Sequence, residues 1–262
     1  MLRRRMMMGQ GESIDYSQMY LTFKALESGT FTFSVNAISY SLDGGSTWTS
    51  LPASTATPTI AAGQEICWKA SGLTPTSSAG IGTFSASGLY KAYGNIMSLI
   101  YGDNFIGQTE LLDDYQFRNL FYNNTNLIDI KGLVMPATSL TTRCYWCMFQ
   151  QSGITSAPYG LLPATTLSYE AYGYMFAECY SLTNAPNLLA AYLTYHSYVG
   201  MFRNTQVNRV KCLATSWSSS DGGATYTWLQ GAPSTGTFIK ARTANWGTGT
   251  SGIPSGWTVQ NE

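Results

Sequence analysis

Leu162-Pro163-Ala164-Thr165-Thr166-Leu167 and, eight residues beyond it, Met175-Phe176-Ala177-Glu178-Cys179 make up one unit of an internal repeat. The Met-Phe pair, which is Leu-Phe in the first copy, occurs four times along the second half of the chain. Successive phenylalanines are 28, 27 and 26 residues apart, at Phe121, Phe149, Phe176 and Phe202. Self-similarity at a period of roughly 20 to 50 residues indicates supersecondary units that stack on one another.

Each unit keeps an internal register that predicts its local structure. After Leu140, Leu167 and Leu193, a tyrosine follows at the fifth residue, a methionine at the eighth and a phenylalanine at the ninth. These offsets fit one broad apolar stripe of an α-helix, so we predict a helix of about ten residues with a threonine before it as N-cap. The residues before each proline are expected to be extended, because a residue before proline avoids the α region. Every unit is thus predicted to be a short strand, a turn and a short helix, stacked as a solenoid.

The first third of the chain follows a period of two instead. Apolar and polar residues alternate over 31–35 and again over 38–42, which is typical of strands with one buried face. Asp43-Gly44-Gly45 is a strong hairpin-turn signal at the end of the second segment. We therefore predict a small antiparallel β-sandwich over residues 19–90.

The predicted fold class is accordingly α+β, with an N-terminal antiparallel β-sandwich, a short solenoid of strand-plus-helix units and a C-terminal cap. A solenoid needs an atypical last unit to cover its terminal apolar face. Beyond residue 213 the repeat decays into two strand-like segments, which suit that purpose. The expected organisation is a flexible leader at 1–18, the β-sandwich at 19–90, repeats with a lead-in at 91–212 and a capping segment at 213–262.

One local motif in the N-terminal part has a known physical basis. Ser41-Leu42-Asp43-Gly44-Gly45-Ser46-Thr47-Trp48 fits the Asp-box pattern S-x-D-x-G-x-T-W, a hairpin whose aspartate accepts turn N–H groups while the tryptophan packs beneath it. Asp-boxes occur in sialidases, where they are scaffold elements away from the chemistry. This chain has a single copy and no matching arginine cluster, so a structural role is favoured and a carbohydrate-active enzyme is a remote alternative.

The composition of the chain limits the classes of partner that we expect. Charged residues make up 11% of the chain, less than half of the ~25% of an ordinary soluble domain, and 14 basic residues balance 14 acidic ones. Without a basic stripe, a nucleic-acid partner is not expected. No apolar run approaches the ~18 residues of a membrane span, so membrane insertion is not expected either. Arg3-Arg4-Arg5 resembles the start of a signal peptide, but the apolar stretch behind it is too short for a recognisable one.

Cys144-Tyr145-Trp146-Cys147 is a CxxC sequence with a redox, a zinc and a structural interpretation. A redox pair needs a thioredoxin-like unit, and a zinc site needs a second Cys/His pair. In the register, Cys144 takes the small inward position of Ala171 and Ser197. We predict structural cysteines, no metal site and no cofactor, and the odd total of five cysteines argues against a disulfide framework.

No other group of residues suggests catalysis, so we predict that the protein is not an enzyme and has no catalytic residues. His196 is the only histidine, and its neighbour Ser197 would not face it on a helix. Its position in the register is that of Arg143 and Glu170, which we expect to be variable and exposed. Asp113-Asp114 precedes the first unit and is expected to be a solvated loop.

The candidate binding residues are those that differ between units on the constant frame. Large aromatic and single charged side chains occupy these positions, as contact residues commonly do. The alternatives are sequence drift on an unconstrained face, or a competing surface on the extended segments around Asn126, Asp129, Thr183 and Asn184. The predicted ligand-binding residues are Arg143, Trp146, Tyr169, Glu170, Tyr174, Tyr195 and His196.

The pattern Pro-x-x-x-Leu … Met-Phe-x-x-Cys-x-x-Leu resembles the BspA-like (Treponema pallidum type) leucine-rich repeats found in Bacteroides and their phages. It is clearest across Pro163, Leu167, Met175, Phe176, Cys179 and Leu182. Residues 20–23 and 94–99 upstream are similar to the same family. The resemblance implies a leucine-rich-repeat fold, a role in adhesion or surface recognition, and neither a cofactor nor a reaction.

The expected function is therefore non-catalytic binding or adhesion at a bacterial or phage surface, in which the repeats recognise a host or bacterial surface glycan or protein. The expected location is extracellular, at a cell surface or in a phage virion. The alternative is a structural virion protein, such as a fibre or decoration protein, whose repeats pack against other subunits.

Overall fold

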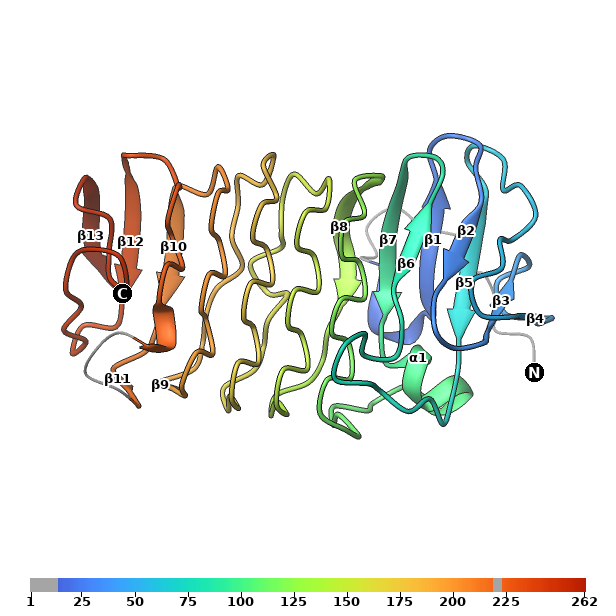
Figure 1. The fold of residues 1–262 in the computed structure, drawn as a ribbon, viewed down its shortest axis with the longest axis horizontal. Helices are drawn as coiled ribbons and strands as arrows, with labels where there is room; N and C mark the ends of the chain where they lie inside the picture. The colour runs from blue at the N-terminus through green and yellow to red at the C-terminus, as the bar shows by residue number, and fades with distance from the viewer. Residues whose placement is uncertain (1–13, 219–222) are drawn as a thin grey trace.

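The computed structural model describes residues 14–218 and 223–262 and shows an elongated molecule with a β-sheet at one end and stacked units along the rest (Figure 1). The predicted leader lies outside the described residues up to Ser13, and its last part forms a 3-10 turn, η1 (Tyr16–Gln18). Asp15 caps this turn by accepting a hydrogen bond from the Ser17 backbone N–H. No helix in the described ranges has the length and apolarity to cross a membrane.

The N-terminal part is built on a six-stranded sheet in the order β4-β3-β5-β1-β7-β8. Adjacent strands in this sheet are antiparallel, except that β7 and β8 are parallel to each other. A separate antiparallel pair, β2–β6, packs over it. The strands are β1 (Leu21–Ala25), β2 (Phe31–Phe33), β3 (Ile38–Ser41), β4 (Thr49–Leu51), β5 (Glu65–Lys69), β6 (Phe84–Ala86), β7 (Tyr90–Asn95) and β8 (Leu127–Val134).

Aromatic side chains fill the space between these strands. Phe23 of β1 lies at the centre, with its ring 4.8 Å from those of Phe84 and Tyr90 and 5.5 Å from that of Trp68. Rings at these separations and tilts add to the hydrophobic gain of burial. After β7 the chain forms the four-residue helix α1 (Ser98–Tyr101) and the 3-10 turn η2 (Gly102–Asn104) before it enters the repeats.

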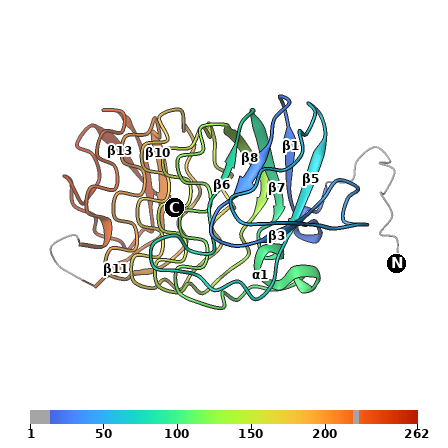
Figure 2. The ribbon, with the colours of Figure 1, turned by 45° about the vertical axis from the view of Figure 1, so that its right-hand side comes forward.

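The units stack against β8, which is the edge strand of this sheet. Figure 2 shows them as successive parallel loops between β8 and the C-terminal strands. Each unit contains a nine-residue segment of consecutive turns, which we call a rung. Four rungs lie in the aligned units, at residues 115–123, 143–151, 170–178 and 196–204, and a further rung at 224–230 accepts backbone hydrogen bonds from the last of them.

Backbone hydrogen bonds alternate along each rung between the unit itself and the next one. In the second rung, every odd-numbered N–H donates to the next unit: Arg143, Tyr145, Cys147, Phe149 and Gln151 donate to the carbonyls of Tyr169, Ala171, Gly173, Met175 and Ala177. The even-numbered N–H groups donate three residues back within the rung: Trp146, Met148, Gln150 and Ser152 donate to Arg143, Tyr145, Cys147 and Phe149. Neither set is the i to i−4 pattern of an α-helix.

Every fourth residue of a rung has a left-handed backbone conformation, which restores the direction of the chain after each turn. In the second rung these residues are Arg143, Cys147 and Gln151, with φ of 52°, 54° and 60°. The conformation costs roughly 1–2 kcal/mol for a residue other than glycine. The hydrogen bonds between units and the buried core offset this cost. The equivalent residues are Tyr115, Asn119 and Asn123; Glu170, Tyr174 and Glu178; and His196, Gly200 and Asn204.

The predicted α+β fold with a strand-plus-helix solenoid is therefore wrong. In the described ranges the α-helix is confined to α1, which precedes the repeats, and the strands form several small sheets. The predicted helical stripe of Tyr145, Met148 and Phe149 belongs to a rung with a period of four residues, in place of 3.6. The N-terminal part also differs from the predicted antiparallel sandwich, since its sheet is mixed and continues into β8.

Two columns of stacked rings form the core of the repeats. In one, Phe121, Phe149, Phe176 and Phe202 lie 5.4 to 5.6 Å apart with planes 5° to 7° from parallel. In the other, Tyr145 stacks on Tyr172 at 5.6 Å and 10°, and the column continues on both sides: Phe117, Tyr145, Tyr172, Tyr198, Trp228 and Trp246. The stacks explain why the same residue types recur at the same place in successive units.

The stack ends in a three-stranded parallel sheet in the order β10 (Arg209–Cys212), β12 (Gly236–Lys240) and β13 (Trp257–Asn261). A separate two-stranded parallel sheet is formed by β9 (Tyr192–Leu193) and β11 (Ser216–Trp217), and the 3-10 turn η3 (Gly223–Thr225) comes after β11 in the chain. Trp228 and Trp246 lie between these elements and extend the core to the end of the stack.

Candidate functional site

The structure brings the seven predicted binding residues together at one end of the rungs. Arg143, Glu170 and His196 are the first left-handed residues of three successive rungs, with φ of 52°, 54° and 55°. Each lies beside the next because the rungs are in parallel hydrogen-bonded register. Trp146, Tyr169, Tyr174 and Tyr195 surround this charged row. We call the set of seven the tyrosine–arginine face.

Glu170 is the centre of the charged row. It was predicted to be exposed, but its side chain is only 6% exposed. Arg143 Nε donates to Glu170 Oε2, and His196 Nδ1 lies 3.5 Å from Glu170 Oε1. Burial disfavours the charged carboxyl, but the hydrogen bonds and positive charge supplied by Arg143, together with the neighbouring Tyr169, more than offset this and hold the pKa of Glu170 below its ordinary value.

The tyrosines of this face form a short exposed stack. The rings of Tyr169 and Tyr195 lie 5.8 Å apart with planes 12° from parallel. The Arg143 guanidinium lies 5.4 Å from the Tyr169 ring centre, and the His196 ring lies 3.8 Å from that of Tyr195. Tyr169 is still 40% exposed and Tyr195 45%. Their ring faces are therefore covered, and what solvent meets is ring edges and hydroxyl groups.

Trp146 and Tyr174 extend the face along the rungs, with their rings 5.1 Å apart at 66°. Arg143 lies 5.5 Å from the Trp146 ring centre, and Arg203 lies 5.4 Å from that of Tyr174. Guanidinium groups over aromatic faces gain electrostatic stabilisation from the ring quadrupole. The face is thus an interlocked set in which each ring is held by a cation or another ring.

Glycines in the following unit make room for these two large rings. A Cβ on Gly173 would lie 2.3 Å from a ring carbon of Trp146, and a Cβ on Gly200 would lie 2.4 Å from a ring carbon of Tyr174. Each large side chain therefore lies over the glycine of the adjacent rung. The sequence showed that these positions vary between units but not that they vary as complementary pairs.

The CxxC cysteines are buried, and their thiols lack the lowered pKa that a redox cysteine needs. Burial raises the pKa of Cys144 well above its ordinary value and that of Cys147 to about 12. The Cys179 thiol donates to the Phe149 carbonyl oxygen, 2.9 Å away. Within the described ranges, no cluster of three or more His, Cys, Asp or Glu side chains has the geometry of a metal site.

The other residues considered for catalysis have structural contacts. The Ser197 hydroxyl is buried and donates to the Thr194 carbonyl at 3.0 Å, while His196 faces Glu170. Asp114 accepts a hydrogen bond from the Thr142 backbone N–H at 2.8 Å, so it caps the next unit's rung. No pair among these residues has the nucleophile-to-base contact that covalent catalysis needs.

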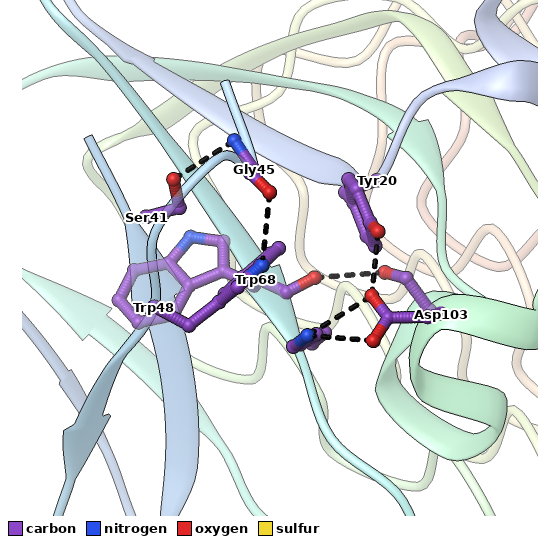
Figure 3. A network of polar contacts seen from close by, with 8 residues as sticks. Tyr20, Ser41, Gly45, Trp48, Trp68 and Asp103 are labelled. Carbon is purple, nitrogen blue, oxygen red and sulfur yellow. Dashed lines mark hydrogen bonds and ion pairs between the residues drawn. The ribbon is translucent and has the colours of Figure 1, made fainter. Parts of the chain in front are cut away.

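A separate polar network holds the Asp-box between β3 and β4, at the N-terminal end of the molecule (Figure 1 and Figure 3). Asp43 accepts hydrogen bonds from the backbone N–H groups of Ser46 and Thr47, and the Trp48 indole donates to the Gly45 carbonyl at 3.1 Å. The Lys69 ammonium lies 4.3 Å from the Trp48 ring centre and pairs with Asp103 at 2.8 Å. These contacts fasten the hairpin to the turn after α1.

Comparison with known proteins identifies no relative. No protein-family model, no curated protein and no solved structure shows a significant match to the chain.

Proposed function

We propose that the protein is a non-catalytic binding protein and that the tyrosine–arginine face is its contact surface. The observation that carries this proposal is the exposed Tyr169–Tyr195 stack, held in place by Arg143 and His196. Tyrosine and arginine are enriched at the energetic centres of protein interfaces. Side chains that are already ordered lose little conformational entropy on binding, which favours affinity.

The ligand that suits this face best is a protein surface. A sugar ring packs its C–H groups against an open aromatic face, but the faces of Tyr169 and Tyr195 are occupied by each other and by Arg143 and His196. The ring edges and hydroxyl groups that remain are suited to the polar backbone and side chains of a polypeptide. We propose a partner at a bacterial or phage surface, the setting that the resemblance to BspA-like repeats implies.

The test is a binding screen against arrays of bacterial and host surface proteins, in which each hit is measured again with the double variant Tyr169→Ala/Tyr195→Ala. Both side chains are exposed, so the variant is expected to keep the wild-type circular dichroism, with a small fall in melting temperature from the lost ring contacts. The expected result is a loss of affinity of at least about tenfold, or about 1.4 kcal/mol. Hits that the variant retains at full strength would contradict the proposal, and so would an absence of hits.

A second candidate function, packing between subunits of a virion, is favoured by β13. In the part of the chain described, β13 pairs with β12 alone, and its residues from Thr258 to Asn261 are exposed. An open strand edge is a template for pairing with another chain. Light scattering over a range of concentrations would detect such assembly, and Val259→Lys is expected to abolish it. A wild-type protein that stays monomeric throughout would argue against this role.

A further inference from the structure

A hollow of about 350 Å³ lies at the opposite end of the rungs from the tyrosine–arginine face. Its walls come from three consecutive units, and the side chains that line it are amides, hydroxyls, a carboxylate and one tyrosine. We call it the amide groove and define it by Asn123, Gln151, Ser152, Glu178, Tyr180 and Ser181. Its volume lies in the range of small-ligand sites, roughly 300–1,000 Å³.

Glu178 is the fixed polar group of the groove. Its two carboxylate oxygens accept hydrogen bonds from Gln151 Nε2 at 2.6 Å and from Arg203 at 2.7 Å. These two hydrogen bonds lower the pKa of Glu178, so the carboxylate is ionised at neutral pH. A carboxylate oxygen has more than one lone-pair site, so each can accept a further hydrogen bond from a ligand.

Two polar side chains in the groove are available to a ligand. The side chains of Asn123 and Ser181 make no hydrogen bond to any other residue in the described ranges. An amide offers two donors and an acceptor, and a hydroxyl offers one donor and two acceptor sites. Together with Glu178, they can serve ligand groups that both donate and accept.

Tyr180 differs from the tyrosines of the other face. It is 65% exposed, and none of the described rings or cations lies over it. Tyr159, a comparably exposed tyrosine, has the Arg209 guanidinium 4.9 Å from its ring centre. Tyr180 therefore presents an open aromatic surface next to a set of fixed and free polar groups.

These features match the chemistry of a pyranose. One side of a sugar ring is lined with C–H groups and packs on an aromatic ring, while its hydroxyls both donate and accept hydrogen bonds. The sugar should be uncharged, because the Glu178 carboxylate would repel an acidic sugar, and its ion pair with Arg203 leaves no net negative charge to attract a basic one. We propose that the amide groove binds a neutral pyranose, with Tyr180 as the stacking ring and Glu178, Asn123 and Ser181 as hydrogen-bonding groups.

The test uses six neutral methyl pyranosides on the full chain: α-mannoside, β-glucoside, β-galactoside, N-acetyl-β-glucosaminide, α-fucoside and β-xyloside. Saturation-transfer NMR and calorimetry should detect at least one with an affinity of about 1 mM or weaker, the range of a single shallow site. Tyr180→Ala is expected to weaken that binding by at least about tenfold. Tyr180→Phe, which keeps the ring, should retain it.

Tyr159→Ala is the matched control, because it removes a tyrosine of similar exposure whose ring is covered. It should leave sugar binding unchanged. The methyl β-glycoside of galacturonic acid, whose free carboxylate carries a negative charge, should bind more weakly than methyl β-galactoside. The proposal is overturned if none of the six sugars binds, if Tyr180→Ala binds as the wild type does, or if the acidic sugar binds best.

The amide groove is independent of the proposed protein-binding function. Tyr169→Ala/Tyr195→Ala alters the other end of the rungs and should leave sugar affinity at the wild-type value. Tyr180→Ala should in turn leave protein binding unchanged. Failure of one proposal is thus distinguishable from failure of the other.

Discussion

The rings of Phe149 and Phe176 lie 5.4 Å apart with their planes 7° from parallel, although the two residues are 27 positions apart in the sequence. Each ring also stacks on the phenylalanine of its other neighbouring unit. Successive units are therefore held together by a continuous column as well as by backbone hydrogen bonds. This relationship makes the rungs mutually dependent and leads to the first prediction.

Phe149→Ala should destabilise the protein by about 3–5 kcal/mol, because it removes a fully buried ring and leaves a cavity in the column. Phe149→Leu keeps most of the apolar volume and should cost markedly less. Urea denaturation followed by circular dichroism would measure both. A loss below about 1 kcal/mol for Phe149→Ala would show that the column does not hold the units together.

The left-handed positions of the rungs should tolerate glycine and reject β-branched residues. Asn123 has φ of 53° and an exposed side chain, so backbone strain can be tested there with little change in packing. Asn123→Val should lower the free energy of unfolding by about 1–3 kcal/mol, whereas Asn123→Gly should be close to neutral. Equal effects of the two substitutions in urea titrations would refute the backbone assignment.

Trp146 and Gly173 should be energetically coupled. Gly173→Ala places a Cβ where the Trp146 ring lies, so the indole must move and lose its contacts. In a Trp146→Ala background the indole is gone and the same methyl group meets a Val199 methyl carbon, 3.2 Å away, which is a much milder contact. A double-mutant cycle on the free energy of unfolding should give a coupling of about 0.5–3 kcal/mol, with the double variant more stable than the sum of the single changes predicts. Simple additivity would rule out the steric pairing.

Acid should weaken the charged row of the tyrosine–arginine face. The pKa of Glu170 is lower in the folded protein than its ordinary value of 4.5, so the unfolded state takes up a proton first as the pH falls. The stability from this group is complete above pH 4.5 and is lost as the pH falls through the folded pKa. Glu170→Gln should therefore show a shallower fall in melting temperature between pH 5 and 3 than the wild type. Parallel curves for the two proteins would contradict this contribution.

All five cysteines should be unreactive in the native protein. Each is buried, and burial raises the pKa of Cys179 to about 11 and that of Cys212 to about 12. A thiol-specific chromogenic reagent at pH 8 should report five thiols in denaturant and almost none in native buffer over the same time. Rapid reaction of Cys144 or Cys147 in the native state would reopen a redox role for the CxxC sequence.

The register of the repeat could be predicted from the sequence, but the conformation of each unit could not. Aligning the units placed Tyr145, Tyr172 and Tyr198 at one position, and they occupy one column. The helix prediction failed because the spacing of Tyr145, Met148 and Phe149 fits a period of four as well as one of 3.6. The left-handed residues give only a mixed turn signal: Asn119, Asn123, Gly200 and Asn204 are of the types that favour this conformation, whereas Arg143 and Gln151 are not.

For the predicted binding residues, too, the sequence indicated the positions but not the contacts. Variation between units pointed to the positions of the tyrosine–arginine face, and the register implied that equivalent residues are neighbours. The burial of Glu170 and the covered rings of Tyr169 and Tyr195 depend on side-chain packing that spacing does not encode. The amide groove was missed, although the second residue after each phenylalanine is always an amide or a carboxylate: Asn123, Gln151, Glu178 and Asn204.

The alternating hydrogen bonds of the rungs also determine how repeat units can be added to, or removed from, such a protein. Each rung presents carbonyl groups to one neighbour and N–H groups to the other, in the same pattern from unit to unit. A duplicated segment of one period would therefore find matching partners on both sides and add one ring to each aromatic column. Growth or shortening by whole units keeps the frame intact, so duplication within the gene can enlarge the surface that the units present while each unit keeps its geometry.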